Sequence, residues 1–545
     1  MTEGVGGIGN MAGGALNEVL TLGEAASFVR VSQKTLGEMA RAGRIPCQRV
    51  GREWRFLRSA VEEWLANEHP AGESRRIPSL QQRPTQRTLP FAEVEGRAGA
   101  PPTRGNGFGD TAFTINQQEP IHRWVPWIAG FSASFVASVL DRAKETRGRK
   151  VVVLDPFAGV GTTLVESVRR GFTAVGFEIN PYAAMVARTK VECWRYDVKQ
   201  LRRTVSEFVH YMDVHGKEQP RSRPPTGFLS RSPFFGSAVQ RKVLHVLDFI
   251  RDQDLPWVQN VLRMSLGAVL VSVSNYSYEP SLSRRSAAGK ADIADADVAD
   301  AMARKLRDIC SDISALQDDV ARLGSRPKGE IFQKSFLTDW SAVPKGSVDF
   351  LITSPPYLNN YHYIRNTRPH LFWLDLVARR SELKALEQAN FGKFWQTVRA
   401  GPPVSLSFMH DEIEQKLDLL RRRNPDRGVY GGRGWANYAA SYFNDCWVLC
   451  RAARALLKPG ATMVVVIGNN ILQGIEFETD RYLAEIAERC GFEVCGVHEV
   501  RKKRTGSSII NSSVRSAGSK KSVELHESAV ELRLLPDSGR RRGED

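Results

Sequence analysis

Apolar runs and glycine turns alternate along the middle of the chain in the order of an α/β fold. Residues 151–154 are Val-Val-Val-Leu, a helix is expected over residues 162–170, and a second apolar run follows at residues 173–177. Short β-branched runs joined by a helix are typical of a βαβ unit, whose two strands are parallel and buried. Residues 348–352 form another such run. The pattern therefore predicts a buried parallel sheet flanked by helices.

Two further stretches have the spacing of amphipathic helices. Residues 438–457 predict one helix, in which Cys446 and Cys450 lie one turn apart. That spacing could indicate a metal site, but we favour a buried face of the helix. A second, longer helix is predicted by apolar residues at heptad-like spacing, which are Met302, Leu306, Ile309, Ile313, Leu316, Val320 and Leu323.

The first apolar run ends in the sequence DPFAGVGTT, residues 155–163. Gly159 and Gly161 allow a sharp turn and the close approach of a ligand to the backbone, although such turns are common in nucleotide-binding folds. The turn lacks the lysine of a phosphate-binding loop, so it suits a cofactor without phosphates. The next strand ends in Glu178, where a carboxylate can accept hydrogen bonds from a ribose diol.

The run at residues 348–352 ends in the sequence TSPPY, residues 353–357. Prolines fix φ, so this loop holds a backbone carbonyl rigidly. An exocyclic base amine is a poor nucleophile because its lone pair is delocalised, and two acceptors aimed at its protons can free that lone pair. Together the two motifs resemble the amino-methyltransferases of DNA, which move a methyl group from S-adenosyl-L-methionine to an exocyclic amine of adenine or cytosine.

This resemblance implies a Rossmann-like methyltransferase sheet, with a strand at residues 461–467 and a final antiparallel pair at residues 491–498 and 531–535. It implies that the Ser354 side chain and the Pro355 carbonyl accept the protons of the target amine. Pro356 stiffens the loop, and Tyr357 offers a ring on which an extruded base stacks. The residues implied to bind the cofactor are Phe131, Ser132, Asp155, Phe157, Gly159, Gly161, Thr162, Glu178 and Asp339.

Several functions remain open on the residues alone. Ser354 at the head of the catalytic loop favours cytosine N4 as the target, with adenine N6 as the alternative. An RNA base methyltransferase, a protein-glutamine methyltransferase and a DNA-binding regulator with a decayed methylase are further alternatives. Chemistry at carbon 5 of cytosine would need a Pro-Cys nucleophile, and the only Pro-Cys pair, Pro46-Cys47, lies outside the predicted sheet.

Residues 19–66 predict a separate small domain. Thr21 and Glu24 form a capping box for a first helix, Ser32 caps a second, and a hairpin turns at Gly51 before a last helix at residues 58–65. This module resembles the winged helix-turn-helix of excisionases and MerR-type regulators, although such modules also bind proteins. The resemblance implies DNA contacts from the second helix and from the wing, at Lys34, Thr35, Arg41, Arg49, Arg52 and Arg55.

The remaining chain divides by composition and spacing. We expect disorder over residues 1–18, a flexible linker over 67–110, the cofactor half of the core over 111–194, an insertion that holds the target-recognition region over 195–328, and the catalytic half over 329–545. The segment 358–435 is a second insertion, longer than the sheet requires, and it could hold the target-recognition region instead. Candidate DNA contacts in the catalytic half are Arg365, Arg368, Arg501, Lys502 and Lys503.

Charge and cysteine content indicate the kind of partner and the cellular compartment of the protein. The 545 residues carry a formal net charge of +16, which favours a polyanionic partner such as double-stranded DNA. Seven cysteines without a CxxC pair indicate reduced thiols and a cytoplasmic protein. We expect no metal, no signal segment and no membrane partner. A cognate restriction or defence system is a candidate partner, and the sequence does not indicate an oligomeric state.

Overall fold

The computed structural model describes residues 19–29, 31–41, 45–50, 53–57, 61, 108, 111–127, 130–142, 150–230, 232–278, 281–324, 326–359, 361–503 and 525–536. Contacts divide the chain into two units, residues 1–89 and residues 90–545. The disorder expected at residues 1–18 lies outside the described residues, as does nearly all of the linker expected at 67–110. The other expected domain boundaries stay predictions.

The N-terminal unit contains β1 (Val19–Thr21), α1 (Leu22–Phe28), α2 (Gln33–Arg41), β2 (Gln48–Val50) and β3 (Glu53–Leu57). Both predicted caps are present, since Thr21 and Glu24 form the capping box and the Ser32 hydroxyl accepts a hydrogen bond from the Thr35 amide. The hairpin is β2–β3, in the sheet order β1-β3-β2. β1 was not predicted, because it is defined only by its pairing with β3. Most of the last predicted helix lies outside the described residues.

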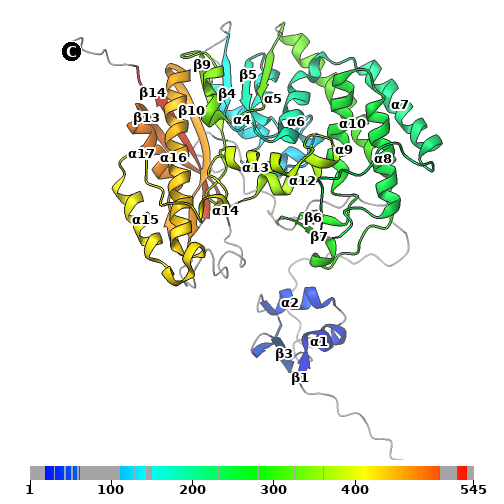
Figure 1. The fold of residues 1–545 in the computed structure, drawn as a ribbon, viewed down its shortest axis with the longest axis horizontal. Coiled ribbons are helices and arrows are strands. Elements are labelled where there is room, and N and C mark those ends of the chain that lie inside the picture. The colour runs from blue at the N-terminus through cyan, green and yellow to red at the C-terminus, as the bar shows by residue number, and fades with distance from the viewer. Residues whose placement is uncertain are drawn as a thin grey trace, which may run out of the picture. The chain divides into compact units, whose positions relative to one another are not determined.

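A seven-stranded sheet forms the centre of the larger unit, in the order β13-β14-β10-β9-β4-β5-β8 (Figure 1). Its strands are β4 (Val152–Asp155), β5 (Thr173–Phe177), β8 (Lys328–Phe332), β9 (Val348–Thr353), β10 (Leu457–Gly468), β13 (Phe492–Lys503) and β14 (Leu525–Leu534). β8, β5, β4, β9 and β10 run parallel, and β14 is antiparallel to both of its neighbours. The α/β methyltransferase-type sheet predicted from the sequence is confirmed.

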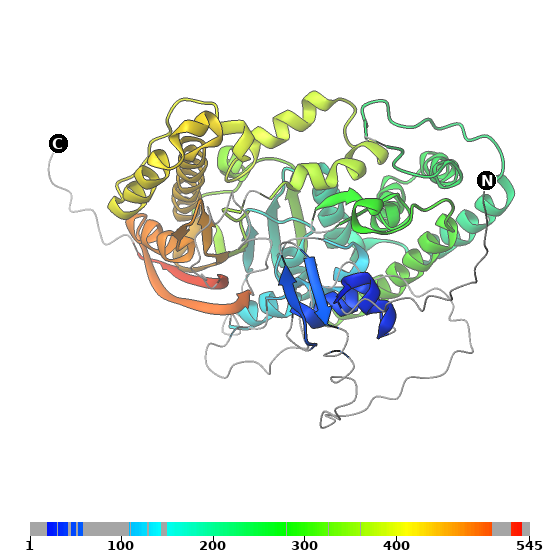
Figure 2. The same cartoon turned by 90° about the horizontal axis from the view of Figure 1, so that it is seen from below.

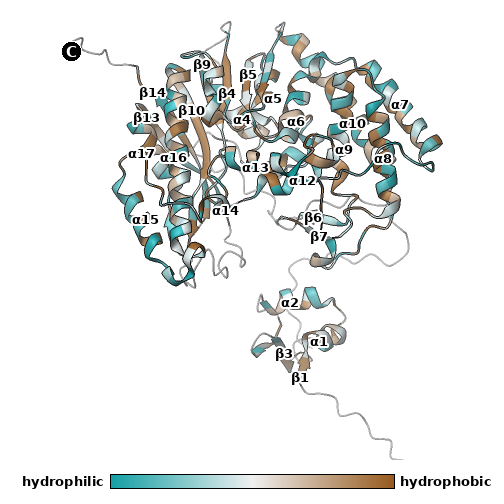
Figure 3. Cartoon of the chain, viewed as in Figure 1, coloured by the Kyte–Doolittle hydropathy of each residue, from teal (hydrophilic) through white to brown (hydrophobic). Residues whose placement is uncertain are grey.

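Helices cover both faces of this sheet. α4 (Ala133–Asp141), α5 (Thr162–Arg169) and α6 (Pro181–Glu192) lie on one side of it, and α16 (Gly432–Leu456) and α17 (Thr479–Arg489) on the other. Successive strand residues alternate between the two cores, so Ile352 packs in the core that contains α4 and Leu351 packs in the core that contains α16. Figure 3 shows the central strands as hydrophobic, as burial on both faces requires.

The segment between β5 and β8 forms a helical layer. It contains α7 (Val198–His215), α8 (Ser237–Arg251), α9 (Pro256–Leu270), the hairpin β6 (Tyr276–Tyr278) and β7 (Leu282–Arg284), and α10 (Val298–Leu323). These helices share one hydrophobic core with α5 and α6. The predicted apolar stripe of α10 is buried as far as Val320, whereas Leu323 is 46% exposed because it lies in the last turn, just before Gly324 ends the helix.

The second insertion, residues 358–435, follows the catalytic loop and contains α12 (Tyr363–Trp373), α13 (Arg380–Ala389), α14 (Trp395–Val398) and α15 (Asp411–Arg422). Figure 2 shows the helices of the insertion and the helices α15 to α17 at opposite ends of the larger unit. The shorter elements are α11 (Phe336–Asp339), β11 (Asn470–Leu472), β12 (Ile475–Phe477), η1 (Phe113–Gln117), η2 (His122–Trp124), η4 (Cys193–Arg195), η5 (Arg285–Ala288), η6 (Trp340–Ala342) and η7 (Pro425–Tyr430).

Several boundaries differ from the prediction. The final antiparallel pair is longer than expected, since β13 continues to Lys503 and β14 begins at Leu525. The helix predicted at 438–457 begins at Gly432, and its Cys446 and Cys450 are buried as predicted. β10 begins at Leu457, before the turn expected at 458–460, because the strand continues through an irregularity in which Gly460 has a φ of +78°. In the described part of the chain, every helix is too short or too polar to cross a membrane.

Candidate active site

The two sequence motifs lie side by side although they are far apart in the chain. β4 ends at Asp155 and β9 ends at Thr353, and these strands are direct neighbours. The Thr353 hydroxyl donates a hydrogen bond of 2.6 Å to Asp155 Oδ1. The chain order of the strands reverses between β4 and β9, and such a reversal opens a crevice at the carboxyl ends of an α/β sheet. The motifs therefore meet at the usual ligand position of this architecture.

The turn after β4 depends on its glycines. Gly159 and Gly161 have φ values of +50° and +88°, in the left-handed region that other residues rarely adopt. A Cβ atom on Gly161 would lie 3.1 Å from the Ala187 Cβ, so α6 closes the space behind it. A Cβ atom on Gly159 would lie 3.5 Å from the Trp127 indole nitrogen. Trp127 is thus a neighbour of the turn that the sequence did not identify.

Glu178 connects the turn to the end of β5. Its Oε2 accepts a hydrogen bond of 2.9 Å from the Gly159 amide, and its Oε1 accepts one of 2.7 Å from the Asn180 amide. Burial raises the pKa of Glu178 to about 7, against the lowering effect of these amides, and the Asp155 charge raises it further. A carboxylate has about four acceptor positions, so this side chain can still receive a hydroxyl donor beside its backbone partners.

Asp155 is more deeply buried than Glu178 and already has its hydrogen-bond partners. It is 2% exposed, and its Oδ1 accepts hydrogen bonds from Thr353 and from the Phe157 amide. Burial raises the pKa of Asp155 to about 6, while the bonds from Thr353, Thr163 and Phe157 oppose that rise. Asp155 therefore ties the glycine turn to the catalytic loop.

The catalytic loop presents a half-buried Ser354, a buried Pro355, and half-buried Pro356 and Tyr357. The Tyr357 hydroxyl donates a hydrogen bond of 3.3 Å to Glu527 Oε1 on β14. Burial and the Glu527 charge raise the pKa of Tyr357, so its hydroxyl stays protonated. No local motif marked Glu527, because its position depends on the pairing of β14 with β10.

The other residues predicted to bind the cofactor are buried or half-buried, and several already contact other parts of the protein. Phe157 packs edge-on against Phe391 at a ring distance of 4.9 Å, and Thr162 is buried at the first residue of α5. Phe131 is buried, and the Ser132 hydroxyl caps α4 by accepting a hydrogen bond from the Phe135 amide.

Asp339 is 36% exposed at the end of α11, where its carboxylate bonds to Thr338 and Lys334. The contacts of Phe131, Ser132 and Asp339 with a cofactor stay predictions.

The candidate DNA-binding residues of the N-terminal unit differ in whether their side chains already have partners within the protein. Lys34, Arg41 and Arg49 are exposed, and Thr35 is exposed but shares a hydrogen bond with Ser32. Arg55 forms an ion pair of 2.6 Å with Glu53. Arg52 lies outside the described residues.

In the catalytic half, Arg365 is exposed and Arg368 is half-buried. Lys502 is exposed and lies 3.9 Å from Glu499, and Arg501 lies 4.0 Å from Glu527. The side chain of Lys503 lies outside the described residues. The roles of all these residues in DNA binding stay predictions.

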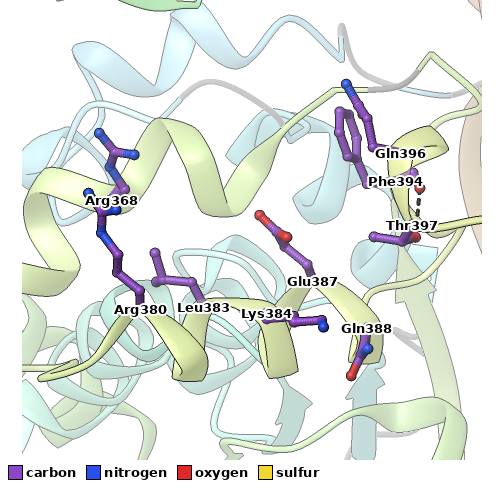
Figure 4. A pocket seen from close by; sticks show the side chains of 9 residues that line it. All are labelled: Arg368, Arg380, Leu383, Lys384, Glu387, Gln388, Phe394, Gln396 and Thr397. Atoms are coloured by element: carbon purple, nitrogen blue, oxygen red, sulfur yellow. Dashed lines mark hydrogen bonds between the residues drawn. The ribbon is translucent and has the colours of Figure 1, made fainter. Parts of the chain in front are cut away.

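A pocket of about 720 Å³ lies between α12, α13 and α14, in the segment that follows the catalytic loop (Figure 4). We name it the α12–α13 pocket, and its lining residues are Arg368, Arg380, Leu383, Lys384, Glu387, Gln388, Phe394, Gln396 and Thr397. His362, at the start of α12, packs against the Phe394 ring, and Phe391 packs against Phe157 of the glycine turn. The segment 391–394 thus contacts both the glycine turn and the start of α12.

Most of the chain is similar in sequence to type II methyltransferases. The type II methyltransferase M.AvaI of Nostoc sp. is 24% identical over 404 residues, which are 70% of this chain and 81% of that protein. The type II methyltransferase M.BsoBI of Geobacillus stearothermophilus is 20% identical over 436 residues, which are 73% and 83% of the two chains. A solved structure of the rRNA methyltransferase aviRa from Streptomyces viridochromogenes covers 75% of this chain and 87% of its own, with 11% identity and a TM-score of 0.26.

The N-terminal unit has its own match. Residues 19–69 match the helix-turn-helix domain family, which agrees with the helices and hairpin described above. Methyltransferases of the kind represented by the two bacterial relatives use S-adenosylmethionine as methyl donor. The larger part of the chain is thus similar in sequence to type II methyltransferases, and residues 19–69 match the helix-turn-helix domain family.

Proposed function

We propose that this protein is a DNA amino-methyltransferase that methylates an exocyclic amine of an extruded base, with cytosine N4 as the favoured target and adenine N6 as the alternative. The observation that supports it is the meeting of the glycine turn and the TSPPY loop at the strand reversal, joined by the Thr353–Asp155 hydrogen bond. Ser354 at the head of the loop carries the preference for cytosine.

The residues around the turn fit the cofactor. Gly159 and Gly161 keep the backbone open for close approach, and Glu178 can still receive a hydroxyl donor from the ribose. Phe157 and Trp127 contribute apolar surface beside the turn. When bound, S-adenosylmethionine supplies an electrophilic methyl group on a sulfonium.

The catalytic loop acts on the target amine. The Ser354 hydroxyl and the Pro355 carbonyl accept its two protons, which draws the nitrogen toward a tetrahedral form with a free lone pair. The two prolines hold these acceptors in place before the base arrives, so little reorganisation is needed. The Tyr357 ring offers a stacking surface to the base, and the bond to Glu527 restrains that ring.

Duplex DNA is the proposed substrate, because type II methyltransferases are relatives of this chain and the net charge is +16. The N-terminal helix-turn-helix supplies a second DNA contact through the exposed cations of α2 and the wing. A cognate restriction or defence system is proposed as the biological partner, and the cytoplasm as the location.

Incubation of the purified protein with DNA and S-adenosylmethionine tests this function. Mass spectrometry of the digested DNA should find N4-methylcytosine, whereas N6-methyladenine would establish the alternative target. Methylated RNA nucleosides, with unmodified DNA in the same experiment, would replace the proposal by an RNA enzyme. The absence of any modified nucleoside, despite cofactor binding, would favour a regulator with a decayed methylase.

Cofactor affinity should rise between about pH 6 and pH 8. The pKa of Glu178 is raised to about 7, so its carboxyl is largely protonated at the lower pH and accepts hydrogen bonds poorly. Ionisation of Glu178 makes both carboxylate oxygens full hydrogen-bond acceptors again. Because the cofactor binds the ionised form more tightly, bound cofactor in turn lowers the pKa of Glu178. Calorimetric titration across this range measures the effect. Glu178→Gln should bind weakly and without this pH dependence, and an equally steep profile in that variant would assign the titration elsewhere.

Removal of the N-terminal unit should weaken DNA binding without abolishing chemistry. The two units have separate hydrophobic cores, and both motif loops lie in the larger one. A variant that begins near residue 108 should therefore still methylate DNA, with a higher KM for DNA and a similar kcat. Loss of all turnover in a folded, cofactor-binding variant would show that the helix-turn-helix forms part of the active site.

A further inference from the structure

Several positively charged side chains gather at the α12–α13 pocket. Arg368, Arg380 and Lys384 line it, and Arg365 lies one turn before Arg368 on α12. Among the described residues, no carboxylate forms an ion pair with any of these four side chains. Two acidic residues of the same segment already have partners, since Glu382 pairs with Arg379 and Asp375 with Arg251.

The two arginines are held in place by a backbone from the distant insertion. Arg368 Nη2 donates a hydrogen bond of 2.9 Å to the Leu229 carbonyl, and Arg380 Nε donates one of 3.3 Å to the Gly227 carbonyl. Between these residues, the Phe228 ring lies under the Arg368 guanidinium at 5.5 Å. A Cβ atom on Gly227 would lie 2.5 Å from the Ala378 carbonyl oxygen, so this close approach requires glycine. The insertion therefore orients both guanidinium groups.

This arrangement is unfavourable until an anion arrives. Burial lowers the pKa of Arg368, and repulsion from Arg380 and Arg365 lowers it further. An arginine always carries its charge, so the repulsion persists in the free protein. Each guanidinium has donors left beyond its backbone bond, in the planar geometry that suits phosphate oxygens. The rest of the pocket is less positive, because Glu387 and two glutamines line it.

We propose that Arg368 and Arg380 form a phosphate site for the backbone of the DNA strand that enters the catalytic loop. Helix α12 begins six residues after Tyr357, and Phe394 of the pocket packs against His362 at the start of that helix. A phosphate bound here would fix the strand next to the base that is extruded. The site rests on the proposed function in one respect, because both take duplex DNA as the partner.

Arg380→Ala tests the site, because Arg380 is exposed and its loss leaves the core intact. Affinity for a mixed-sequence duplex should fall about tenfold at ~0.1 M salt, as for one charge-assisted hydrogen bond. The magnitude of the slope of log K against log salt should decrease by about 0.9, as expected when one phosphate is no longer neutralised. Arg380→Glu should change both quantities further in the same direction.

Arg379→Ala is the matched control, since Arg379 is the preceding residue, carries the same charge and pairs with Glu382 instead of lining the pocket. Equal effects of Arg379→Ala and Arg380→Ala would reduce the finding to general electrostatic attraction and overturn the site. An unchanged slope in Arg380→Ala would also overturn it. Weaker binding of free dCMP by Arg380→Ala, with normal DNA binding, would assign the pocket to a free nucleotide instead.

The methyl-transfer rate at saturating DNA separates this inference from the proposed function. The control Arg379→Ala should retain the wild-type rate there, because Arg379 belongs to neither motif loop and does not line the pocket. If wild-type protein transfers no methyl group but binds DNA with a slope that depends on Arg380, the proposed chemistry is wrong and the phosphate site stands.

Discussion

Ser354→Ala should slow methyl transfer by about a hundredfold or more, while S-adenosylmethionine binds as tightly as to the wild type. Ser354 would contact the target amine and not the cofactor, and loss of one preorganised hydrogen bond in such a site reduces the rate by about that factor. Single-turnover transfer to DNA measures the chemical step without product release. Calorimetric titration of the cofactor measures the binding that should persist.

Tyr357→Phe is the matched control in the same loop. It removes one hydroxyl, as Ser354→Ala does, but keeps the stacking ring and gives up the hydrogen bonds of that hydroxyl to Glu527 and Ser354. We expect a mild effect. If Ser354→Ala and the wild type transfer at the same rate, the loop is not the site of chemistry. If Tyr357→Phe is as slow as Ser354→Ala, the hydroxyl network around Glu527 matters more than the amine contact.

Glu178→Ala should weaken S-adenosylmethionine binding by about a hundredfold. The ribose hydroxyls would no longer have a carboxylate acceptor, and hydrogen bonds to charged groups contribute about 1.5–3 kcal/mol each. The substitution also removes the acceptor of the Gly159 and Asn180 amides, so the glycine turn loses its restraint. Isothermal calorimetry on the folded variant gives the affinity directly.

Glu192→Ala is the control for this substitution, because Glu192 is a half-buried glutamate at the far end of α6. Its loss should leave cofactor affinity unchanged. Thermal unfolding of both variants shows whether a weaker affinity reflects the site or the fold. Undiminished binding by Glu178→Ala would remove the central residue of the proposed cofactor site.

The strands around the site were predictable because their signals are local. Residues 173–177 and β5 coincide, and β9 extends the predicted run by one residue, since β-branched runs between turn residues leave little choice of boundary. The caps of α1 and α2 were found for the same reason. β1 was not found, because a three-residue strand depends on its partner β3. β10 began early because tertiary pairing carried it through Gly460.

The site was predictable only where a motif carries it. The glycine turn, Glu178 and the TSPPY loop were identified by residue type and spacing. Trp127 and Glu527 were missed because they reach the site through packing and strand pairing rather than through sequence proximity. The α12–α13 pocket could not be predicted for a different reason. Two segments considered as alternative recognition regions build it together, since residues 227–229 orient Arg368 and Arg380.

The hydrogen bond between Thr353 and Asp155 also has a consequence for folding during translation, because it can form only late in synthesis. It joins residues 198 positions apart, and at about 5–20 residues per second the ribosome needs about 10–40 s to make the segment between them. During that interval β4 can pair with β5, but its other edge has no partner because β9 does not yet exist. An open strand edge invites pairing with other chains. Messages that end within the insertion therefore yield aggregation-prone fragments, and the active site is completed only after its whole insertion has been translated.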